Sequence, residues 1–126
     1  MTDFSEALSI STSGMKAQST RLRHVSENIA NTDTPGYRRK TISFETELRS
    51  GEVEAGRVRL DRSDLERIYD PANPLADASG HYDGSNVNML LEITDAREAQ
   101  RGYEANLKMF EQVRDMSSAL MDLLRR

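Results

Sequence analysis

The sequence offers few residues whose types and spacing suit catalysis. Only two histidines are present, His24 and His81, and they belong to different segments of a 126-residue chain that contains no cysteine. Disulfides and thiolate metal sites are therefore excluded, and no Gly-X-Ser-X-Gly nucleophile elbow occurs. We expect His24 to lie in solvent beside the apolar stripe of a helix, and His81 to lie in a loop. This pattern predicts that the protein is not an enzyme.

Two carboxylates in a proline-containing stretch, Asp70 and Asp77, are of the type that binds calcium. An EF-hand loop needs oxygen ligands at closely set positions and a glutamate at its end, and this stretch lacks that spacing. Methionines at helical spacing indicate adaptable packing more often than a copper site. Four of them lie toward the C-terminus: Met89, Met109, Met116 and Met121. We therefore predict neither a metal site nor a cofactor.

A run of three cations, Arg38 to Lys40, is the remaining candidate for ligand binding. It allows three interpretations, namely a phosphate site, a solvated turn, and a contact with acidic residues of a neighbouring subunit. The chain has a formal net charge of −4, and one short basic run in an acidic protein is weak evidence for phosphate binding. Because a nucleic-acid-binding protein normally has a basic face, we expect no nucleic-acid partner.

The first element that positions these residues is a helix, which we predict over residues 2–31. Its apolar residues repeat every seven positions and form a narrow stripe of about 100°, which resembles a coiled-coil seam. Two heptad positions make this stripe: Phe4, Ser11, Gln18 and Val25 at one, and Leu8, Met15, Leu22 and Ile29 at the other. After the helix, the pair Pro35-Gly36 fits the centre of a type II turn.

The sequence pattern changes over residues 41–85, where it predicts a small β-rich element followed by a long loop. The stretch TISFETEL alternates between apolar and polar residues, which predicts a strand. The buried side of this strand is expected to carry Ile42, Phe44, Thr46 and Leu48. Two further short extended pieces follow, and residues 69–84 then contain two prolines, two glycines and several Asp and Asn residues, which predicts a loop.

A second long helix is predicted within residues 86–126, and its apolar surface is much wider than that of the first. On a helical wheel this surface covers an arc of roughly 240°, and it includes Tyr103, Leu107, Phe110, Val113, Leu120 and Leu124. The narrow stripe of the first helix cannot cover this arc, so we predict that further copies of the same helices cover it. Because ordering the backbone costs about 1–2 kcal/mol per residue, we expect both ends of the chain to be largely disordered until they assemble.

The end of the first helix also carries a family motif. The stretch SENIANTDTPGYRR resembles the N-terminal signature of the bacterial flagellar axial proteins, which include the rod and hook subunits. The residues that carry this resemblance are Asn28, Asn31, Thr34, Pro35, Gly36 and Tyr37. The C-terminal stretch AREAQRGYEANLKMF is similar to the terminal helix of the same family through Arg101, Tyr103, Ala105 and Asn106.

The loop narrows the resemblance to the C-type proximal rod proteins. Its sequence YDPANPLADASGHY, followed by NVN, matches them at Tyr69, Pro71, Asn73, Pro74, Ala76, Asp77, Gly80, Asn86 and Val87. The short chain also fits a proximal rod subunit better than the hook or distal rod proteins, which carry larger inserts. Another proximal rod subunit of the same family is the alternative.

The resemblance implies a mainly α fold, in which long N- and C-terminal helices form an antiparallel, coiled-coil-like pair. Residues 1–40 and 86–126 would be the polymerisation segments, and residues 41–85 the inserted β-rich element and loop. The implied function is a structural subunit of the proximal rod of the flagellar basal body, a hollow drive shaft that crosses the periplasm and transmits motor torque. The implied partners are copies of the chain, other rod subunits and the flagellar type III export apparatus.

The sequence agrees with export by this route. Its N-terminal region lacks a basic head followed by an apolar stretch, so we expect no cleavable signal peptide, and no apolar run is long enough to span a membrane. We expect the two apolar stripes to pack against neighbouring subunits. We expect a polar strip to face the channel: Glu104, Lys108, Glu111, Asp115 and Asp122. A helical export adaptor or chaperone would share the amphipathic pattern and is the rival interpretation.

Overall fold

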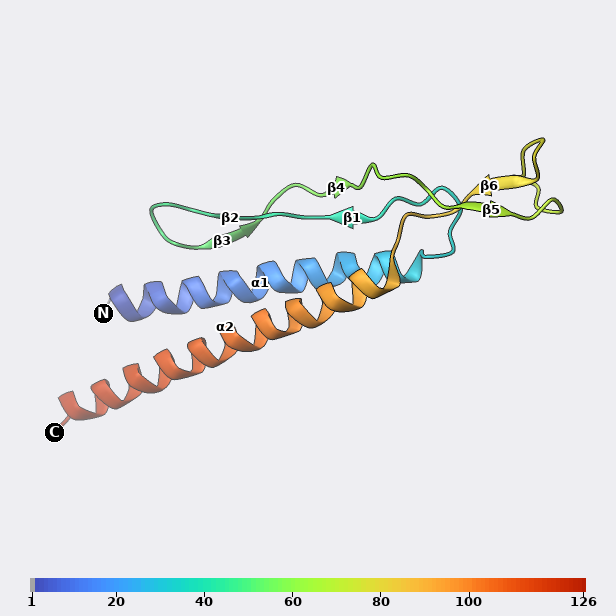
Figure 1. The fold of residues 1–126 in the computed structure, drawn as a ribbon. Helices are drawn as coiled ribbons and strands as arrows, with labels where there is room; N and C mark the ends of the chain where they lie inside the picture. Colours follow the sequence, from blue (N-terminus) through green and yellow to red (C-terminus); the bar gives the residue numbers. More distant parts are fainter. Residues whose placement is uncertain (1) are drawn as a thin grey trace.

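Two long antiparallel helices form the body of the molecule, and a layer of short strands lies along the first of them (Figure 1). The computed structural model describes residues 2–126. Helix α1 spans Thr2–Ala30 and helix α2 spans Met89–Leu124. Asn88 caps α2, because its side chain accepts hydrogen bonds from two backbone N–H groups of the first turn. The prediction of a mainly α fold with a helix toward each end of the chain is confirmed.

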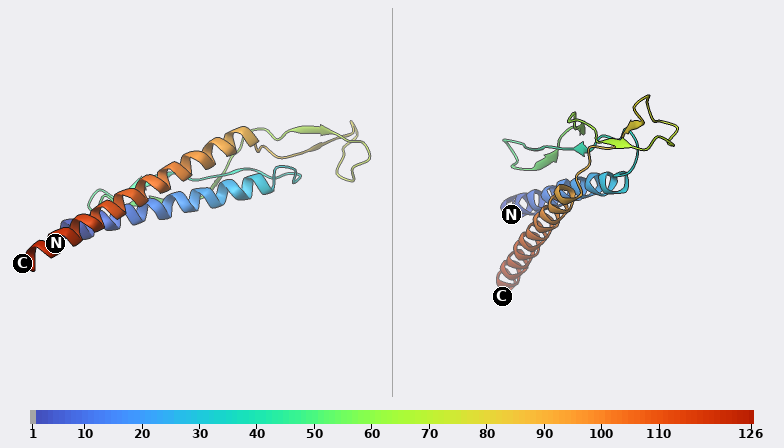
Figure 2. Two further views of the ribbon diagram at one scale, coloured as in Figure 1. Left: turned by 90° about the horizontal axis from the view of Figure 1, so that it is seen from below. Right: turned by 45° about the vertical axis from the view of Figure 1, so that its right-hand side comes forward.

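Six short strands lie between the helices and pair as three separate antiparallel ribbons. Their bounds are β1 Lys40–Thr41, β2 Phe44–Thr46, β3 Val53–Ala55, β4 Arg59–Leu60, β5 Arg67–Tyr69 and β6 His81–Asp83. β1 pairs with β4, β2 with β3, and β5 with β6. The first two ribbons run along α1, whereas the β5–β6 hairpin extends beyond the end of the helix pair (Figures 1 and 2).

The predicted buried side of the first strand is only partly correct. Phe44 is half-buried, but Leu48 is fully exposed, with a relative accessibility of 100%. The strand β2 ends two residues earlier, and the chain then reverses. In this turn Gly51 has a φ of 74°, and its N–H donates to the Glu47 carbonyl at 2.8 Å. The apolar alternation therefore continues past the end of the strand, and Leu48 points into solvent.

Helix α1 is covered on two sides, by α2 and by the strands β1 and β3. The buried residues of the two helices are mostly small or polar: Ser11, Gly14, Ala17, His24, Val25, Asn28, Glu92 and Ala99. The large apolar residues of the predicted heptad stripe, such as Leu22 and Ile29, are half-buried. The helix pair therefore packs through small and polar side chains more than through large apolar ones.

The expectation that His24 lies in solvent is wrong. The side chain of His24 is only 8% exposed, and its Nδ1 lies 3.6 Å from Glu27 Oε2. The residue lines a small hollow together with Lys40 and Thr41 of β1. A helical wheel considers the helices only and does not include the strand layer that covers α1, which is why the prediction failed.

Two glycines, Gly14 and Gly102, mark a close approach of the helices. A Cβ on Gly102 would lie 2.5 Å from Gln18 Nε2, and a Cβ on Gly14 would lie 2.5 Å from Asn106 Oδ1. The Asn106 amide is held there by a hydrogen bond to the Gly102 carbonyl at 2.7 Å. The glycines and amides thus interlock across the helix pair, and this packing offsets the cost of a helical glycine, about 1 kcal/mol relative to alanine.

The helices diverge from their shared end toward the N- and C-termini (Figures 1 and 2). Apolar side chains along α2 are between 37% and 72% exposed: Tyr103, Leu107, Met109, Met116, Leu120, Met121, Leu123 and Leu124. The polar strip that begins at Glu104 is exposed as well. Within residues 2–126, neither helix has an apolar stretch of the length that crosses a bilayer.

Candidate functional site

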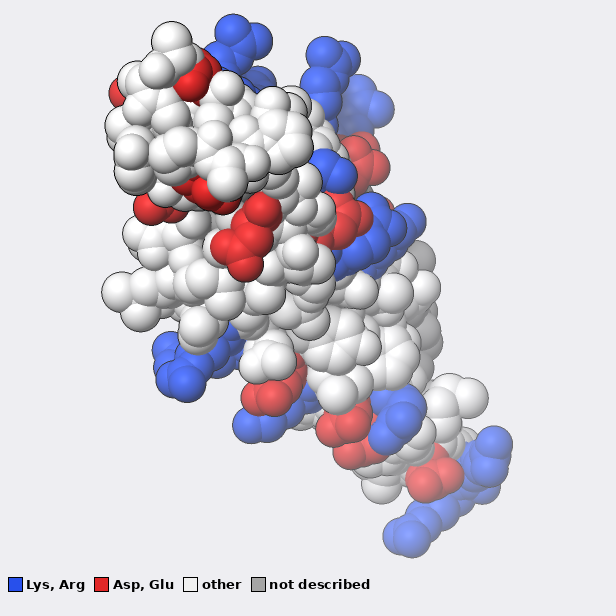
Figure 3. Space-filling view, turned by 90° about the vertical axis from the view of Figure 1, so that its right-hand side faces the viewer, with Lys and Arg blue, Asp and Glu red and all other residues white. Residues whose placement is uncertain are grey.

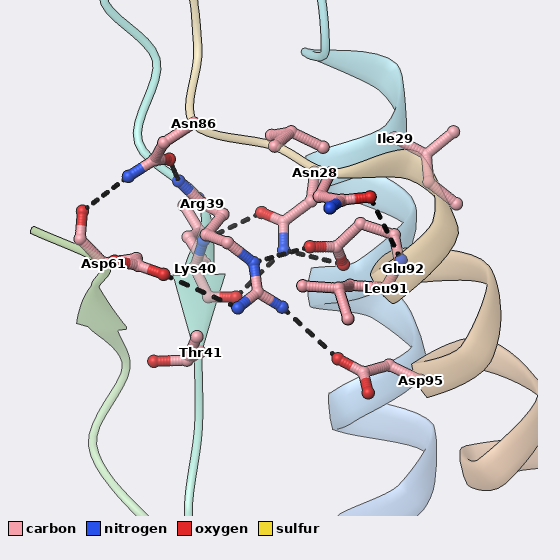
Figure 4. A network of polar contacts seen from close by, with 12 residues as sticks. Asn28, Ile29, Arg39, Lys40, Thr41, Asp61, Asn86, Leu91, Glu92 and Asp95 are labelled. Atoms are coloured by element: carbon pink, nitrogen blue, oxygen red, sulfur yellow. Dashed lines mark hydrogen bonds and ion pairs between the residues drawn. The ribbon is translucent and has the colours of Figure 1, made fainter. Parts of the chain in front are cut away.

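The end of α1, the turn after it and the start of α2 meet in a network of polar side chains (Figure 4). We call this network the junction, and it consists of Asn28, Tyr37, Arg39, Lys40, Asp61, Asn86, Glu92 and Asp95. These residues come from segments that are far apart in the sequence. The geometry of the junction determines how the helix pair is attached to the strand layer.

The turn between α1 and β1 has the conformation that its Pro-Gly pair predicts. The Tyr37 N–H donates to the Thr34 carbonyl at 3.2 Å, and Gly36 has a φ of 73°, which a type II turn requires at this position. Asn31 closes the end of α1, since its Nδ2 donates to the Glu27 carbonyl at 2.8 Å and its Oδ1 accepts from the Thr34 hydroxyl at 3.0 Å. The turn thereby brings the Tyr37 side chain back to α1.

Asn28 is fully buried, at 0% exposure, and every hydrogen-bonding group of its amide has a partner. Its Oδ1 accepts from the Tyr37 hydroxyl and from the Lys40 backbone N–H, both at 2.8 Å. Its Nδ2 donates to the Lys40 carbonyl at 2.9 Å and to Glu92 Oε2 at 3.2 Å. The amide therefore pairs with both backbone groups of Lys40, as a neighbouring strand would, and connects β1 to both helices.

Glu92 also has 0% exposure, and Arg39 balances its charge. Arg39 Nε donates to Glu92 Oε1 at 2.6 Å, and Arg39 Nη2 lies 3.3 Å from Asp95 Oδ2. A third carboxylate, that of Asp61, lies 3.6 Å from Arg39 Nη1. Burial alone would lower the pKa of Arg39, but the hydrogen bond and charge of Glu92, with the other two carboxylates, outweigh it, so the pKa is raised. The three carboxylates therefore stabilise the charged form of Arg39.

Asn86 connects the segment before β1 to the segment before α2. Its Oδ1 accepts from the Arg39 backbone N–H at 2.7 Å, and its Nδ2 donates to the Asp61 carbonyl at 2.9 Å. Its own backbone N–H donates to the Tyr37 carbonyl at 3.3 Å. The chain therefore leaves α1 and returns to α2 along neighbouring paths that are bonded to each other.

The basic run at residues 38–40 lies at the junction, and its side chains bond to groups of the chain itself. Arg38 donates to backbone carbonyls of the segment after β4, and Arg39 pairs with the buried carboxylate described above. Lys40 Nζ lies 2.8 Å from Glu27 Oε2, and this hydrogen bond lowers the pKa of Glu27. Each of the three cations thus has a partner inside the chain.

Three carboxylates of the junction were not predicted from the sequence: Asp61, Glu92 and Asp95. A signal for Glu92 was present, because this residue interrupts the apolar run Leu-Leu-Glu-Ile. Glu92 also precedes the buried Ala99 by two helical turns and so shares its face of α2. An acidic residue on a buried face is rare unless it is paired, which would have indicated an internal cation.

The side chains of the junction satisfy one another, so their role is structural. A buried ion pair contributes modestly to stability, but removing one partner costs about 3–5 kcal/mol because the other charge is left buried. The junction therefore fixes the relative positions of its segments more than it adds to their stability. Across residues 2–126, no three His, Asp or Glu side chains are grouped closely enough to hold a metal ion.

The loop at the tip of the β5–β6 hairpin is ordered by Arg67. Arg67 forms ion pairs with Asp77 at 2.5 Å and with Asp83 at 2.8 Å. The Ser79 hydroxyl and the Arg67 guanidinium hold the pKa of Asp77 well below its usual range. Gly80 has a φ of 82°, which lets the chain turn back into β6. All the predicted loop residues belong to this hairpin: Tyr69, Pro71, Asn73, Pro74, Ala76, Asp77 and Gly80.

Comparison with known proteins assigns these features to one family. The family model described as "Flagella basal body rod protein" matches residues 8–38, and the one described as "Flagellar basal body rod FlgEFG protein C-terminal" matches residues 78–123. A flagellar basal-body rod protein FlgC of Agrobacterium fabrum is 48% identical to the chain, over 99% of the chain and 98% of its own length. The chain belongs to the flagellar basal-body rod protein family.

More distant rod proteins match over most of their length as well. FlgC of Bacillus subtilis is 31% identical over 98% of the chain and 99% of its own length. FlgC of Aquifex aeolicus is 38% identical over 87% of the chain and 89% of its own length. These matches confirm the assignment to the C-type rod proteins that the loop predicted. The chain is therefore a structural subunit of the proximal rod of the flagellar basal body.

In this rod protein the two predicted packing stripes differ in how far the chain itself covers them. On α1, Val25 is buried, and the others are half-buried: Phe4, Leu8, Met15, Leu22 and Ile29. On α2, Phe110 and Val113 are half-buried, and four are exposed: Tyr103, Leu107, Leu120 and Leu124. The apolar surface that remains for a partner is therefore concentrated on α2.

Proposed function

We propose that this rod protein assembles with copies of itself and with other rod subunits into the hollow shaft of the proximal rod, which transmits motor torque. The shaft crosses the periplasm, and the chain reaches it through the flagellar type III export apparatus. The single observation that carries the proposal is the exposed apolar surface of α2.

This surface requires a partner. Its apolar side chains are 37–72% exposed along the part of α2 that diverges from α1. Monomeric soluble proteins rarely present extended apolar patches, and burying one such side chain completely stabilises an assembly by about 1.5–3 kcal/mol. Helices of neighbouring subunits can cover one another repeatedly, and contacts that repeat without closing generate a helical tube.

The layering of the molecule supports a proposal for where each surface lies in such a tube. The strands lie on one side of α1 and α2 lies on the other (Figure 1), so α2 is innermost and the strand layer is outermost. Of the predicted packing residues, Val25 is already buried within the chain. The others pack against neighbouring subunits: Phe4, Leu8, Met15, Leu22, Ile29, Tyr103, Leu107, Phe110, Val113, Leu120 and Leu124. The exposed polar strip faces the channel: Glu104, Lys108, Glu111, Asp115 and Asp122.

The junction gives the subunit the stiffness that a drive shaft needs. Asn28 bonds the outer strand β1 to α1 and α2, and Arg39 pairs with Glu92 of the inner helix. Because these groups are buried and mutually satisfied, the strand layer cannot slide over the helices without breaking several bonds at once. A twist applied to the outer surface is therefore passed to the inner helices.

Deletion and matched substitutions test the proposal in the host bacterium. The deletion strain is expected not to swim, and its basal bodies are expected to lack a complete rod. Leu120→Asp should have the same effect, because it places a charge in the subunit interface. Ser118→Asp, two residues away at an exposed position, is the matched control and should swim. Normal swimming of the deletion strain, or of a Leu120→Asp strain with normal protein levels, would contradict the proposal.

A further inference from the structure

Two surfaces of the strand layer carry opposite charges that form no ion pair within the described residues. The first, the acidic hairpin, is the β2–β3 ribbon, which exposes three glutamates and one arginine among six residues: Glu45, Thr46, Glu47, Leu48, Arg49 and Glu54. The second, the arginine strand, surrounds β4 and has five exposed residues: Arg57, Val58, Arg59, Leu60 and Arg62. Within residues 2–126, none of these glutamates or arginines forms an ion pair.

The acidic hairpin has unfavourable features that contact with a partner would remove, namely opposed like charges and an exposed leucine. Glu45 lies directly opposite Glu54 in the register of the ribbon. Phe44 and Val53, which precede them, are half-buried, so the two glutamates share the outward face. Like charges directly opposite each other destabilise an antiparallel pair. At the tip of the same ribbon, Leu48 is 100% exposed. A cationic surface with apolar side chains would therefore fit the hairpin.

The arginine strand is such a surface. β4 pairs only with β1, which leaves its other edge unpaired. Val58 and Leu60 are 40% and 54% exposed and lie between the arginines. Figure 3 shows Lys and Arg side chains along the upper edge of the molecule, over the strand layer. Positive charge on an exposed edge strand disfavours pairing with an identical strand and favours an acidic partner.

We propose that the acidic hairpin of one copy of the chain docks on the arginine strand of the next copy. The inference rests on the proposed function and specifies a contact between the outer layers of adjacent subunits. Glutamates face arginines in this contact, and Leu48 packs against Val58 and Leu60. Each exposed ion pair changes affinity by at most about fivefold, so the charges set register and partner choice. Because the two surfaces differ, the contact is head-to-tail and repeats in one direction.

Site-specific cross-linking tests the contact in assembled rods, because the chain contains no cysteine. A chain with Glu54→Cys and Arg59→Cys is produced in its host in place of the native chain, and basal bodies are treated with a short bifunctional maleimide. Dimers and higher multiples of the chain are expected, whereas each single-cysteine variant should remain monomeric. The matched control pairs Glu54→Cys with Ala72→Cys, an exposed residue of the β5–β6 hairpin, and should give no multiples.

Provided that the chain is present in the basal bodies, any one of three outcomes would contradict the proposed contact. They are the absence of multiples, a product linked only within one chain, and a product with a protein of another mass. A charge exchange provides a second measurement. Glu54→Arg and Arg59→Glu should each weaken the contact about fivefold and reduce swimming, and the double variant should recover it. If the single variants swim normally, the contact is absent.

The two proposals fail in different ways. Normal swimming of the deletion strain would refute the rod function itself. Loss of swimming on deletion, combined with a missing cross-link, would refute only the contact between hairpin and strand.

Discussion

The side-chain amide of Asn28 donates to the carboxylate of Glu92 at 3.2 Å, and neither residue is exposed to solvent. Two helices that meet through a buried amide and a buried carboxylate have little freedom to slide, because each displacement would leave a polar group without a partner. Specificity at this end of the molecule therefore comes from hydrogen bonds. The apolar side chains whose burial would add stability lie exposed on the surface of α2.

Replacing Asn28 with alanine should destabilise the chain by about 3 kcal/mol. The substitution leaves the Tyr37 hydroxyl and both backbone groups of Lys40 without their buried partner. Urea unfolding followed by far-ultraviolet circular dichroism measures the loss. Ser26→Ala, at an exposed position of the same helix, should change stability by less than about 0.5 kcal/mol. Equal effects of the two substitutions would show that the network around Asn28 does not form.

The two interlocked glycines should respond differently to alanine. Gly14→Ala is expected to destabilise the chain by about 1–2 kcal/mol, because the Asn106 amide it would strike is short and bonded to the Gly102 carbonyl. Gly102→Ala meets the end of the longer Gln18 side chain, which can rotate away, and the helix itself gains about 1 kcal/mol. Thermal melting of both variants should therefore rank Gly14→Ala as clearly less stable, and the reverse order would refute this packing.

Stability should fall when the solution is acidified. The pKa of Glu27 is lowered mainly by its hydrogen bond from Lys40, and the pKa of Asp61 is lowered mainly by hydrogen bonds from Ser63. A carboxylate whose pKa is lower in the folded state stabilises the fold above its unfolded pKa, about 4, and loses that contribution as the pH falls through the folded value. Melting temperatures should therefore be level between pH 7 and about 5 and decline below about 4.

A substitution identifies the source of this acid sensitivity. Lys40→Met removes the main cause of the lowered pKa of Glu27, so part of the decline below about pH 4 should disappear. Arg23→Met, at an exposed position of α1, serves as the control and should keep the full decline. An unchanged profile in Lys40→Met would mean that the ion pair with Glu27 contributes nothing.

Hydrogen exchange of the isolated chain should be fast toward both termini and slow around the junction. The helices diverge toward the termini, where apolar side chains of α2 are exposed, so assembly is expected to order these ends. Backbone amides of residues 2–10 and 113–124 should exchange much faster than those around Asn28 and Glu92. Uniform strong protection along both helices would show a self-sufficient monomer and would contradict the expectation that assembly orders these ends.

Local patterns predicted the parts of the fold that depend on neighbouring residues. The helices followed from apolar spacing, and the Pro35-Gly36 turn followed from the φ that its glycine can adopt. The burial of His24 could not be predicted in this way, because it depends on β1 folding back over α1. Leu48 continues an alternating pattern past the end of its strand, and no local signal marks where the pairing stops.

The sequence singled out five residues of the junction but did not predict that they meet: Asn28, Tyr37, Arg39, Lys40 and Asn86. Asn28 and Tyr37 were found because they belong to a motif contiguous in sequence, whereas Glu92 and Asp61 reach the same place from distant segments. The basic run was read as a surface feature because its partners lie distant in sequence from it, in segments whose approach is set by tertiary structure. Long-range ion pairs of this kind become visible only when the path of the chain is known.

The helix pair is held together at the junction and at the interlocked glycines near its middle, and the helices separate only toward the termini. The separation of these outer ends can change while the junction and the glycine contacts stay intact, because both lie away from the termini. Copies of one polypeptide can therefore occupy places that are not identical, such as the first and last turns of a tube, by opening or closing slightly. Adaptation of this kind needs no alternative fold and no second gene.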